Sequence, residues 1–372
     1  MLLINDPVLL SIEMTTEALR ARSTAHWIIA FSGGKDSSAA LKIFLAAYRR
    51  AGVRLSRITL LYCDTGVENP VLDAYVKEFL RKAEQEFAEL GLSINIELLK
   101  APIPDRFFVR IIGRGYPPPT NSFRWCTTGL RIKPVSEFIA KQNPNNTVVV
   151  LGLRQSESRQ RDRALALSPN LYWQKQREGK GDYDLFLPIV ELSVPEVWDA
   201  IFGLSLPKAL NKSALETLYR GASGECPVIK APTAPPCTSG RFGCWTCTVV
   251  RKDKSASELI KSGHFHLEPF LTFRDWLAEF RNDPINRWHT RRNGRAGLGP
   301  FTINARKEIL RRVDALEDST RTTIIDTEER GVIAALWTMD NFARLAFRRQ
   351  SDLGASKSDS DAILGNLSTA GT

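Results

Sequence analysis

Two patterns of hydrophobic and polar positions alternate over the first 150 residues of the chain. Long amphipathic stretches at 38–50 and 71–90 have the helical period and predict helices. Four short apolar runs predict strands: 27–31, 57–63, 93–99 and 147–151. Strands that alternate with helices indicate parallel βαβ units, so we expect an α/β fold with a doubly wound parallel sheet.

The pattern changes near residue 190, where helical stretches joined by proline-rich connections replace the strands. We therefore divide the chain into four expected parts: an α/β nucleotide-binding domain at 1–190, a Pro-rich cysteine segment at 191–256, a mostly helical basic region at 257–350 and a mobile tail at 351–372.

The loop after the first predicted strand reads Phe31-Ser-Gly-Gly-Lys-Asp-Ser-Ser38. Glycines let backbone N–H groups turn inward, and the N-terminus of the following helix favours an anion. The loop resembles the PP-loop of enzymes that split ATP into AMP and pyrophosphate. We expect it to bind the phosphates of ATP through Ser32, Gly33, Gly34, Lys35, Asp36, Ser37 and Ser38, with Lys35 and Asp36 as catalytic residues.

Polar residues follow the second and fourth predicted strands. Asp64 and Glu68 are placed to accept hydrogen bonds from a ribose or to hold Mg²⁺ on the phosphates. Gly152 allows close approach of a ligand to the backbone, and Arg154 and Arg161 are candidates to clamp phosphates. Because the carboxyl ends of parallel strands meet at one edge of a sheet, these residues and the phosphate loop are expected to converge.

The cysteines form a second constellation, Cys237-x6-Cys244-x2-Cys247. A fourth thiolate would come from Cys126 or Cys226, and four thiolates suit either Zn²⁺ or a [4Fe–4S] cluster. A redox dithiol at Cys244 and Cys247 is a third interpretation. Cys63 ends an apolar strand and is expected to be a small buried hydrophobe.

Composition and charge add a partner. The chain has 372 residues, a net charge of +10 and a pI near 9.4, which indicate an anionic partner beyond ATP. Arginines gather with aromatic residues near Arg287, Arg291, Arg292 and Arg295, and a solvated basic face is the plainer interpretation. With no apolar membrane span and no secretion signal apparent, we expect a cytoplasmic protein whose six cysteines are metal ligands or reactive thiols.

Taken together, the motifs resemble one family, the DndC-type DNA phosphorothioation sulfurtransferases, which are relatives of the sulfonucleotide reductases. The resemblance covers about 27–312. It is carried by the phosphate loop and by five further segments: Gly113-Arg-Gly-Tyr-Pro-Pro-Pro-Thr, Phe123-Arg-Trp-Cys-Thr, 154–161, Gly224-Glu-Cys-Pro, and Arg241-Phe-Gly-Cys-Trp-Thr-Cys. The last segment is the most specific, because sulfonucleotide reductases place their cysteines differently.

This resemblance implies an adenine nucleotide alpha hydrolase-like fold and ATP pyrophosphatase activity. It also implies a [4Fe–4S] cluster on Cys126, Cys237, Cys244 and Cys247. The implied partners are DNA, a cysteine desulfurase and other proteins of a phosphorothioation or restriction–modification system. The chain departs from the family pattern at Thr128 and Gly129, where an acidic and a basic residue are expected.

Two other functions stay open at this stage. One is a different PP-loop enzyme, either a sulfonucleotide reductase or a tRNA-thiolating enzyme. The other is a non-catalytic iron–sulfur or zinc subunit that binds DNA. The basic C-terminal half argues against a reductase, and the complete phosphate loop argues against a subunit without catalysis.

Overall fold

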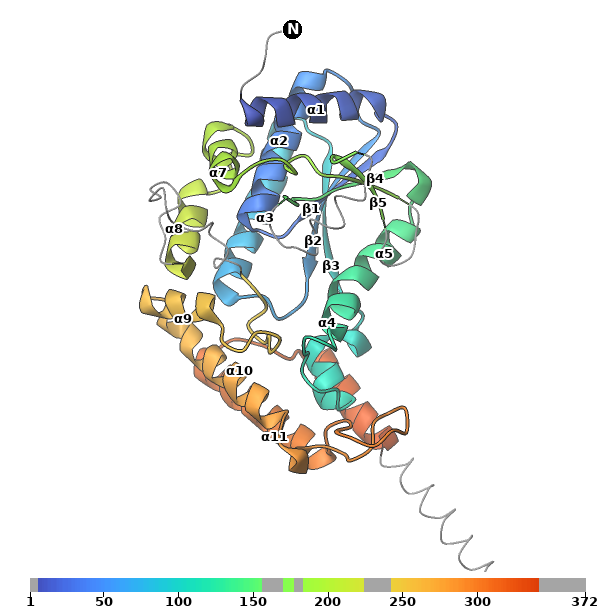
Figure 1. Ribbon diagram of the computed structural model, residues 1–372, viewed down its shortest axis with the longest axis vertical. Helices are drawn as coiled ribbons and strands as arrows, with labels where there is room; N and C mark the ends of the chain where they lie inside the picture. Colours follow the sequence, from blue (N-terminus) through green and yellow to red (C-terminus); the bar gives the residue numbers. More distant parts are fainter. Residues whose placement is uncertain (1–5, 156–169, 177–182, 224–241, 341–372) are drawn as a thin grey trace, which may run out of the picture.

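A six-stranded sheet forms the centre of the larger part of the molecule (Figure 1). The computed structural model describes residues 6–155, 170–176, 183–223 and 242–340. The strand order is β3-β2-β1-β4-β6-β5, with every neighbouring pair parallel except β5 and β6. The strands are β1 (His26–Phe31), β2 (Arg57–Asp64), β3 (Ile94–Lys100), β4 (Thr147–Val150), β5 (Trp173–Lys175) and β6 (Asp184–Phe186). The predicted α/β class with a doubly wound sheet is confirmed.

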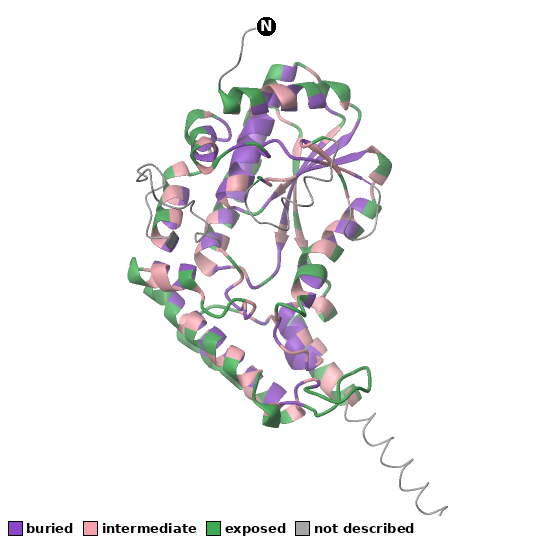
Figure 2. Cartoon of the chain, viewed as in Figure 1, coloured by how far each residue is buried: buried purple, intermediate pink, exposed green. Residues whose placement is uncertain are grey.

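Helices cover both faces of this sheet. They are α1 (Pro7–Ala21), α2 (Lys35–Ala51), α3 (Pro70–Glu89), α5 (Lys133–Ala140), α7 (Val194–Gly203) and α8 (Lys212–Ser223). Side chains of a strand alternate between faces, so Trp27 and Ile29 pack in the core that contains α2 and α3, whereas Ile28 packs with Ile139 of α5. Figure 2 shows α2 as the most completely buried helix of this layer.

The C-terminal part is helical, as expected. It contains α9 (Lys254–Lys261), α10 (Glu268–Phe280), α11 (Ile303–Thr320) and a helical stretch at 327–340. A second apolar core joins these helices to residues that follow β3, and Phe108, Trp125, Trp245 and Phe273 lie within it. The short helix α4 (Trp125–Thr127) belongs to this part. Figure 1 shows α4 and the C-terminal helices below the carboxyl ends of the strands.

The predicted strands and helices of the first 150 residues end within three residues of the observed ones. The pattern did not predict α1, α5, β5 or β6, and the two strands have only three residues each. Tertiary packing explains β5 and β6, because the rings of Trp173 and Phe186 pack on each other and on Trp27. Across the described ranges, no helix has the length and apolar character needed to cross a membrane.

Candidate active site

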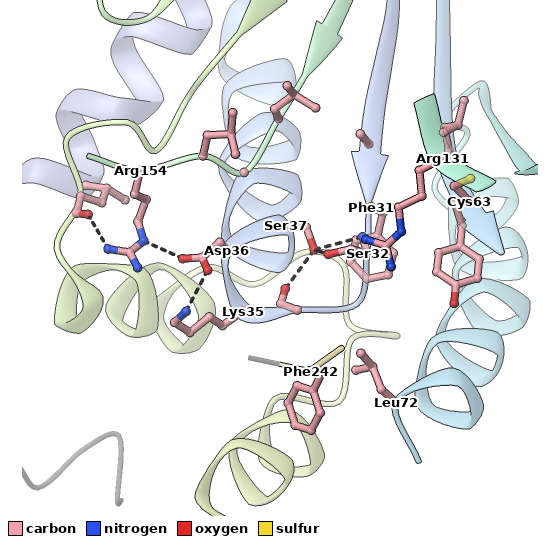
Figure 3. A pocket seen from close by; sticks show the side chains of 18 of the residues that line it. Phe31, Ser32, Lys35, Asp36, Ser37, Cys63, Leu72, Arg131, Arg154 and Phe242 are labelled. Atoms are coloured by element: carbon pink, nitrogen blue, oxygen red, sulfur yellow. Dashed lines mark hydrogen bonds and ion pairs between the residues drawn. The ribbon is translucent and has the colours of Figure 1, made fainter. Parts of the chain in front are cut away.

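A cavity of about 770 Å³ opens at the carboxyl ends of β1, β2 and β4 (Figure 3). The loop after β1, the end of β2 and the segment after β4 all contribute to its walls, as the sequence predicted. Tyr219 of α8 and Phe242, which lies beyond that helix, also line it. The predicted residues that line the cavity are Ser32, Gly34, Lys35, Asp36, Ser37, Gly152 and Arg154.

The phosphate loop is held in shape by its own hydroxyls. Ser37 Oγ accepts a hydrogen bond from Ser32 N at 3.2 Å and donates one to Gly34 O at 3.0 Å. Gly34 is the N-cap of α2 and has no side chain that could cap the helix. The N–H groups of the first turn and the positive end of the α2 dipole therefore face the cavity, where they form an anion site. Gly33 has φ +77°, and a Cβ there would lie 2.1 Å from Val76 Cγ2.

Asp36 joins two cations on one wall of the cavity, as the dashed lines of Figure 3 show. Its carboxylate accepts from Lys35 Nζ at 2.8 Å and from Arg154 Nε at 2.6 Å. Burial raises the pKa of Asp36, but the charges of Lys35 and Arg154 outweigh that effect, and the net result is a lowered pKa. Asp36 stays ionised and positions both cations, which suits binding of a polyphosphate.

Gly152 lies against the backbone of the phosphate loop. A Cβ at this position would lie 2.6 Å from the carbonyl carbon and oxygen of Asp36 and 2.7 Å from Ser37 N. This glycine therefore allows close approach of the chain's own backbone, whereas the sequence predicted close approach of a ligand.

The opposite wall carries Cys63, Glu68 and Arg131. Arg131 Nη2 pairs with Glu68 Oε1 at 2.9 Å, and Cys63 Sγ donates to Leu130 O at 3.2 Å. Burial raises the pKa of the Cys63 thiol to about 11. The expectation that Cys63 is simply a buried hydrophobe is wrong, because its half-buried thiol lines the cavity.

The loop that contains Cys244 and Cys247, which we call the cysteine loop, packs against this wall. Glu68 forms a β-bridge with Cys244, and Trp245 N donates to Val67 O at 3.0 Å. The thiol of Cys244 lies 3.9 Å from Thr65 Oγ1 and 3.8 Å from Arg131 Nη2. Burial, followed by the charge of Glu68, raises the pKa of Cys244 to about 12. The loop after β2 therefore separates the cavity from the cysteine loop by a single layer of side chains.

The three predicted cluster cysteines that the structure describes lie in one region. Cys247 N donates to Cys244 O at 3.0 Å, and the thiols of Cys126 and Cys247 are close enough to influence each other's ionisation. Burial raises the pKa of Cys126. Within the described ranges, no three His, Cys, Asp or Glu side chains are close enough together to hold a metal ion. Cys226 and Cys237 fall in 224–241, outside the described residues.

Three other predicted residues that the structure describes, Gly33, Asp64 and Ser38, are not among those that line the cavity. Asp64 is buried at the end of β2, where Oδ1 accepts from Gly66 N at 2.8 Å and Oδ2 lies 3.5 Å from Lys100 Nζ. It lines a second cavity of about 320 Å³ instead. Ser38 is fully buried inside α2. Arg161 lies in 156–169, outside the described residues.

The comparisons with known proteins now identify the family. Residues 26–250 match the phosphoadenosine phosphosulfate reductase domain family, and this match covers more than half of the chain. The chain belongs to this family. Its phosphate loop, its Asp36-centred cation pair and its Cys-Trp-Thr-Cys loop all lie inside the matched range.

Two curated relatives of this phosphoadenosine phosphosulfate reductase domain protein come from Methanocaldococcus jannaschii. The uncharacterized protein MJ0066 is 28% identical over 46% of this chain and 30% of its own length. The uncharacterized protein MJ0973 is 25% identical over 68% of this chain and 48% of its own length. The chain thus spans less than half of each relative.

Similar solved structures include Candida glabrata FMN adenylyltransferase with FAD and inorganic pyrophosphate, at 13% identity and TM-score 0.37, covering 63% of this chain and 73% of that one. NAD+ synthetase from Burkholderia pseudomallei has 18% identity and TM-score 0.33, covering 86% and 90%.

Sequence reasoning missed two residues that shape the site of this family member. The hydroxyl of Tyr219 accepts from Lys35 N at 3.0 Å, and Lys35 Nζ lies 5.4 Å from the centre of its ring. Arg274 of α10 is buried and donates to the carbonyl oxygens of Cys247, Val250 and Arg251. An arginine among the large apolar residues of 270–277 is the sequence signal that points to such a role.

The structure also shows the surroundings of Thr128 and Gly129, where the sequence departs from the DndC-type pattern that it resembles. Gly129 packs on the Arg110 guanidinium, where a Cβ would lie 3.5 Å from its central carbon. Two neighbouring cations pair with carboxylates, Arg131 with Glu68 at 2.9 Å and Lys133 with Asp105 at 2.7 Å. Charge pairing is therefore kept on this wall without the expected acidic and basic residues.

Proposed function

We propose that this protein is an ATP-cleaving sulfurtransferase of the DndC type, which replaces a non-bridging oxygen of a DNA phosphate with sulfur. The observation that carries this proposal is the contact between the nucleotide cavity and the cysteine loop. Glu68 and Arg131 line the cavity, and both touch Cys244. A phosphate activated in the cavity would therefore lie next to a segment that contains thiols. Neither the phosphate loop nor the cysteine loop alone accounts for this arrangement.

Our proposal gives the phosphate loop the task of binding the β- and γ-phosphates of ATP. N–H groups at the start of α2 and the ammonium of Lys35 stabilise the negative charge of departing pyrophosphate. Asp36 positions Lys35 and Arg154 through its two ion pairs. Mg²⁺ would accompany the phosphates of ATP. Glu68, a carboxylate of the cavity wall, is the residue we propose as its ligand.

The proposed reaction has two balanced steps. An oxygen of the DNA phosphate attacks the α-phosphorus of ATP, the bond to the β-phosphate breaks, and pyrophosphate leaves. A sulfur nucleophile at the oxidation level of sulfide, supplied with a cysteine desulfurase partner, then attacks the DNA phosphorus. The bond to AMP breaks, AMP leaves with the oxygen, and the proton of the nucleophile passes to solvent. Adenylation is needed because an unactivated phosphate oxygen is a poor leaving group.

Thiolates are the donors that an iron–sulfur cluster requires, but in this structure Cys126, Cys244 and Cys247 do not stand close enough together to hold a metal ion. These half-buried thiols lie in one region with the buried Trp125 and Trp245, and Arg131 Nη2 lies 3.8 Å from Cys244 Sγ. The raised thiol pKa values favour protonated cysteines until a metal displaces the protons. We propose that these thiols and Cys237 hold a [4Fe–4S] cluster, which would supply sulfur or electron-transfer chemistry when bound.

The test is product analysis with ATP labelled at the α-phosphate, which follows AMP, and at the γ-phosphate, which follows pyrophosphate. Wild-type protein with its partners and DNA is expected to release AMP and pyrophosphate in equal amounts. Lys35→Ala is expected to reduce this release by about 10²-fold or more, because it removes a charge that faces the developing pyrophosphate. Lys82→Ala is the matched control, since Lys82 lies on the exposed surface of α3, paired with Glu78. Release of ADP and phosphate would contradict the proposal.

The family match favours a second candidate, a sulfonucleotide reductase. That enzyme would release sulfite from phosphoadenosine phosphosulfate with an external thiol reductant and without ATP. Sulfite formation under those conditions, lost in Cys244→Ser, would replace the proposal above with this one.

A further inference from the structure

We infer that a surface formed by residues 114–124 and 287–301 binds a single-stranded segment of nucleic acid, with one base stacked on Phe123. We call it the Phe123 surface. It rests on the proposed function for the identity of the strand as DNA, and it specifies the strand state of that substrate. The two segments are far apart in sequence but adjacent in space, because Phe301 N donates to Gly115 O at 2.7 Å.

An exposed stack of aromatic rings lies at the centre of the Phe123 surface. The Phe123 side chain is 44% exposed, and its ring is parallel to that of Tyr116, with 6.3 Å between centroids and 12° between planes. The guanidinium of Arg292 covers Tyr116 at 4.7 Å from its centroid. A tight turn between Thr120 and Phe123, with hydrogen bonds in both directions, fixes the backbone that presents the ring.

The charged side chains of the two segments have one sign. Residues 114–124 and 287–301 contain no Asp or Glu. Arg124, Arg291, Arg292 and Arg295 are exposed there. Arg292 also donates to Arg114 O, which ties the loop between α10 and α11 (orange in Figure 1) to the segment that leads into α4. Positive charge without acidic residues in either segment fits a polyanion.

The structure also separates these arginines from others that do not contribute. Arg287 and Arg306 are buried and donate to the carbonyl oxygens of Gly299 and Gly113. Arg311 and Arg312 pair with Glu308. Of the expected basic arginines at 287–312, all within the described residues, Arg291, Arg292 and Arg295 are the exposed ones outside these pairs, and all three belong to the Phe123 surface.

An exposed ring beside cations suits unpaired bases. A base stacks on an aromatic side chain only when it is unpaired and turned outward, as in proteins that bind single strands. A duplex would meet the arginines through its phosphates but would leave Phe123 without a partner. Phe123 stands three positions before Cys126, so a strand stacked here passes beside the cysteine region.

The experiment measures binding of the full chain to fluorescein-labelled 20-mers by anisotropy, using single-stranded DNA, the matching duplex and RNA of the same sequence. Phe123→Ala is expected to weaken binding of the single strand about 5-fold or more, whereas Phe123→Tyr keeps it. Arg291→Ala with Arg295→Ala should make the slope of log affinity against log salt shallower by about 1.4, since each contact on a single strand contributes about 0.7. The control, Arg49→Ala with Arg54→Ala, removes equal charge at the far end of α2.

Tighter binding of single strands that depends on Phe123 supports the inference, and an equal effect with RNA supports the surface with RNA as its ligand. Equal binding by wild type and both surface variants would overturn it, as would binding of the duplex alone. This outcome is separate from that of the proposed function. If the protein binds single strands through this surface but cells that carry it form no phosphorothioate, the inference holds and the proposed function is wrong. If cells form phosphorothioate but the surface variants bind single strands as wild type does, only the inference is wrong.

Discussion

Replacing Gly152 with alanine tests whether the contact between β4 and the phosphate loop builds the nucleotide site. The added Cβ would lie 2.6 Å from the carbonyl group of Asp36, whereas ordinary contact begins at 3.4 Å. The two segments must therefore separate by about 0.8 Å, and both partners are backbone that cannot rotate away. Overpacking of this kind costs about 1–3 kcal/mol of unfolding free energy.

The effect on activity is expected to exceed the effect on stability. Displacement of the Asp36 backbone moves its carboxylate, and with it the cations of Lys35 and Arg154. A misplacement near 1 Å costs about 10²-fold in rate when positioning carries the catalysis. We expect Gly152→Ala to remain folded and to release pyrophosphate about 10²-fold more slowly.

Urea unfolding and a pyrophosphate-release assay measure the two effects on the same preparations. Gly203→Ala is the matched control, because Gly203 ends α7 and, among the described residues, no neighbouring atom lies within 4 Å of the place a Cβ would take. That variant is expected to keep its activity and to gain up to about 1 kcal/mol of unfolding free energy. Full activity in a folded Gly152→Ala protein would refute this account of the loop.

Three further predictions concern other parts of the site and the core. Asp36→Asn leaves Lys35 and Arg154 without their shared carboxylate, so we expect weaker ATP binding by calorimetry with little change in fold. Arg274→Met removes donors to three carbonyl oxygens of the cysteine loop, so iron content per chain should fall while ATP binding persists, and equal loss of both would contradict this. Burial, then Arg57, lowers the pKa of His26 to about 4. The unfolded chain therefore binds a proton between about pH 6.5 and 4 that the native chain does not, and stability falls by up to about 3 kcal/mol as the pH drops through that range; His26→Gln should lose this dependence in urea unfolding.

The local parts of the site could be predicted from the sequence. The first strand, the phosphate loop and α2 follow one another directly, and their hydrophobic periods and glycines specify both structure and location. Gly152 was predictable for the same reason, because a short β-branched strand precedes it.

Contacts between distant segments could not be predicted. Cys244 contacts Arg131 of the cavity wall, 113 positions away, and no local pattern encodes that pairing. Asp64 lies at the end of β2, as expected, but its carboxylate accepts a hydrogen bond from Gly66 N and pairs with Lys100. Charge composition likewise does not tell an exposed arginine such as Arg291 from a buried one such as Arg287.

The most direct test of the proposed function is mass spectrometry of nuclease-digested DNA from cells that carry the intact system, beside cells that carry Cys244→Ser. The proposal predicts phosphorothioate-linked dinucleotides in the first sample and none in the second. Digests without sulfur in both samples, with the protein folded and its partners expressed, would contradict DNA as the sulfur acceptor.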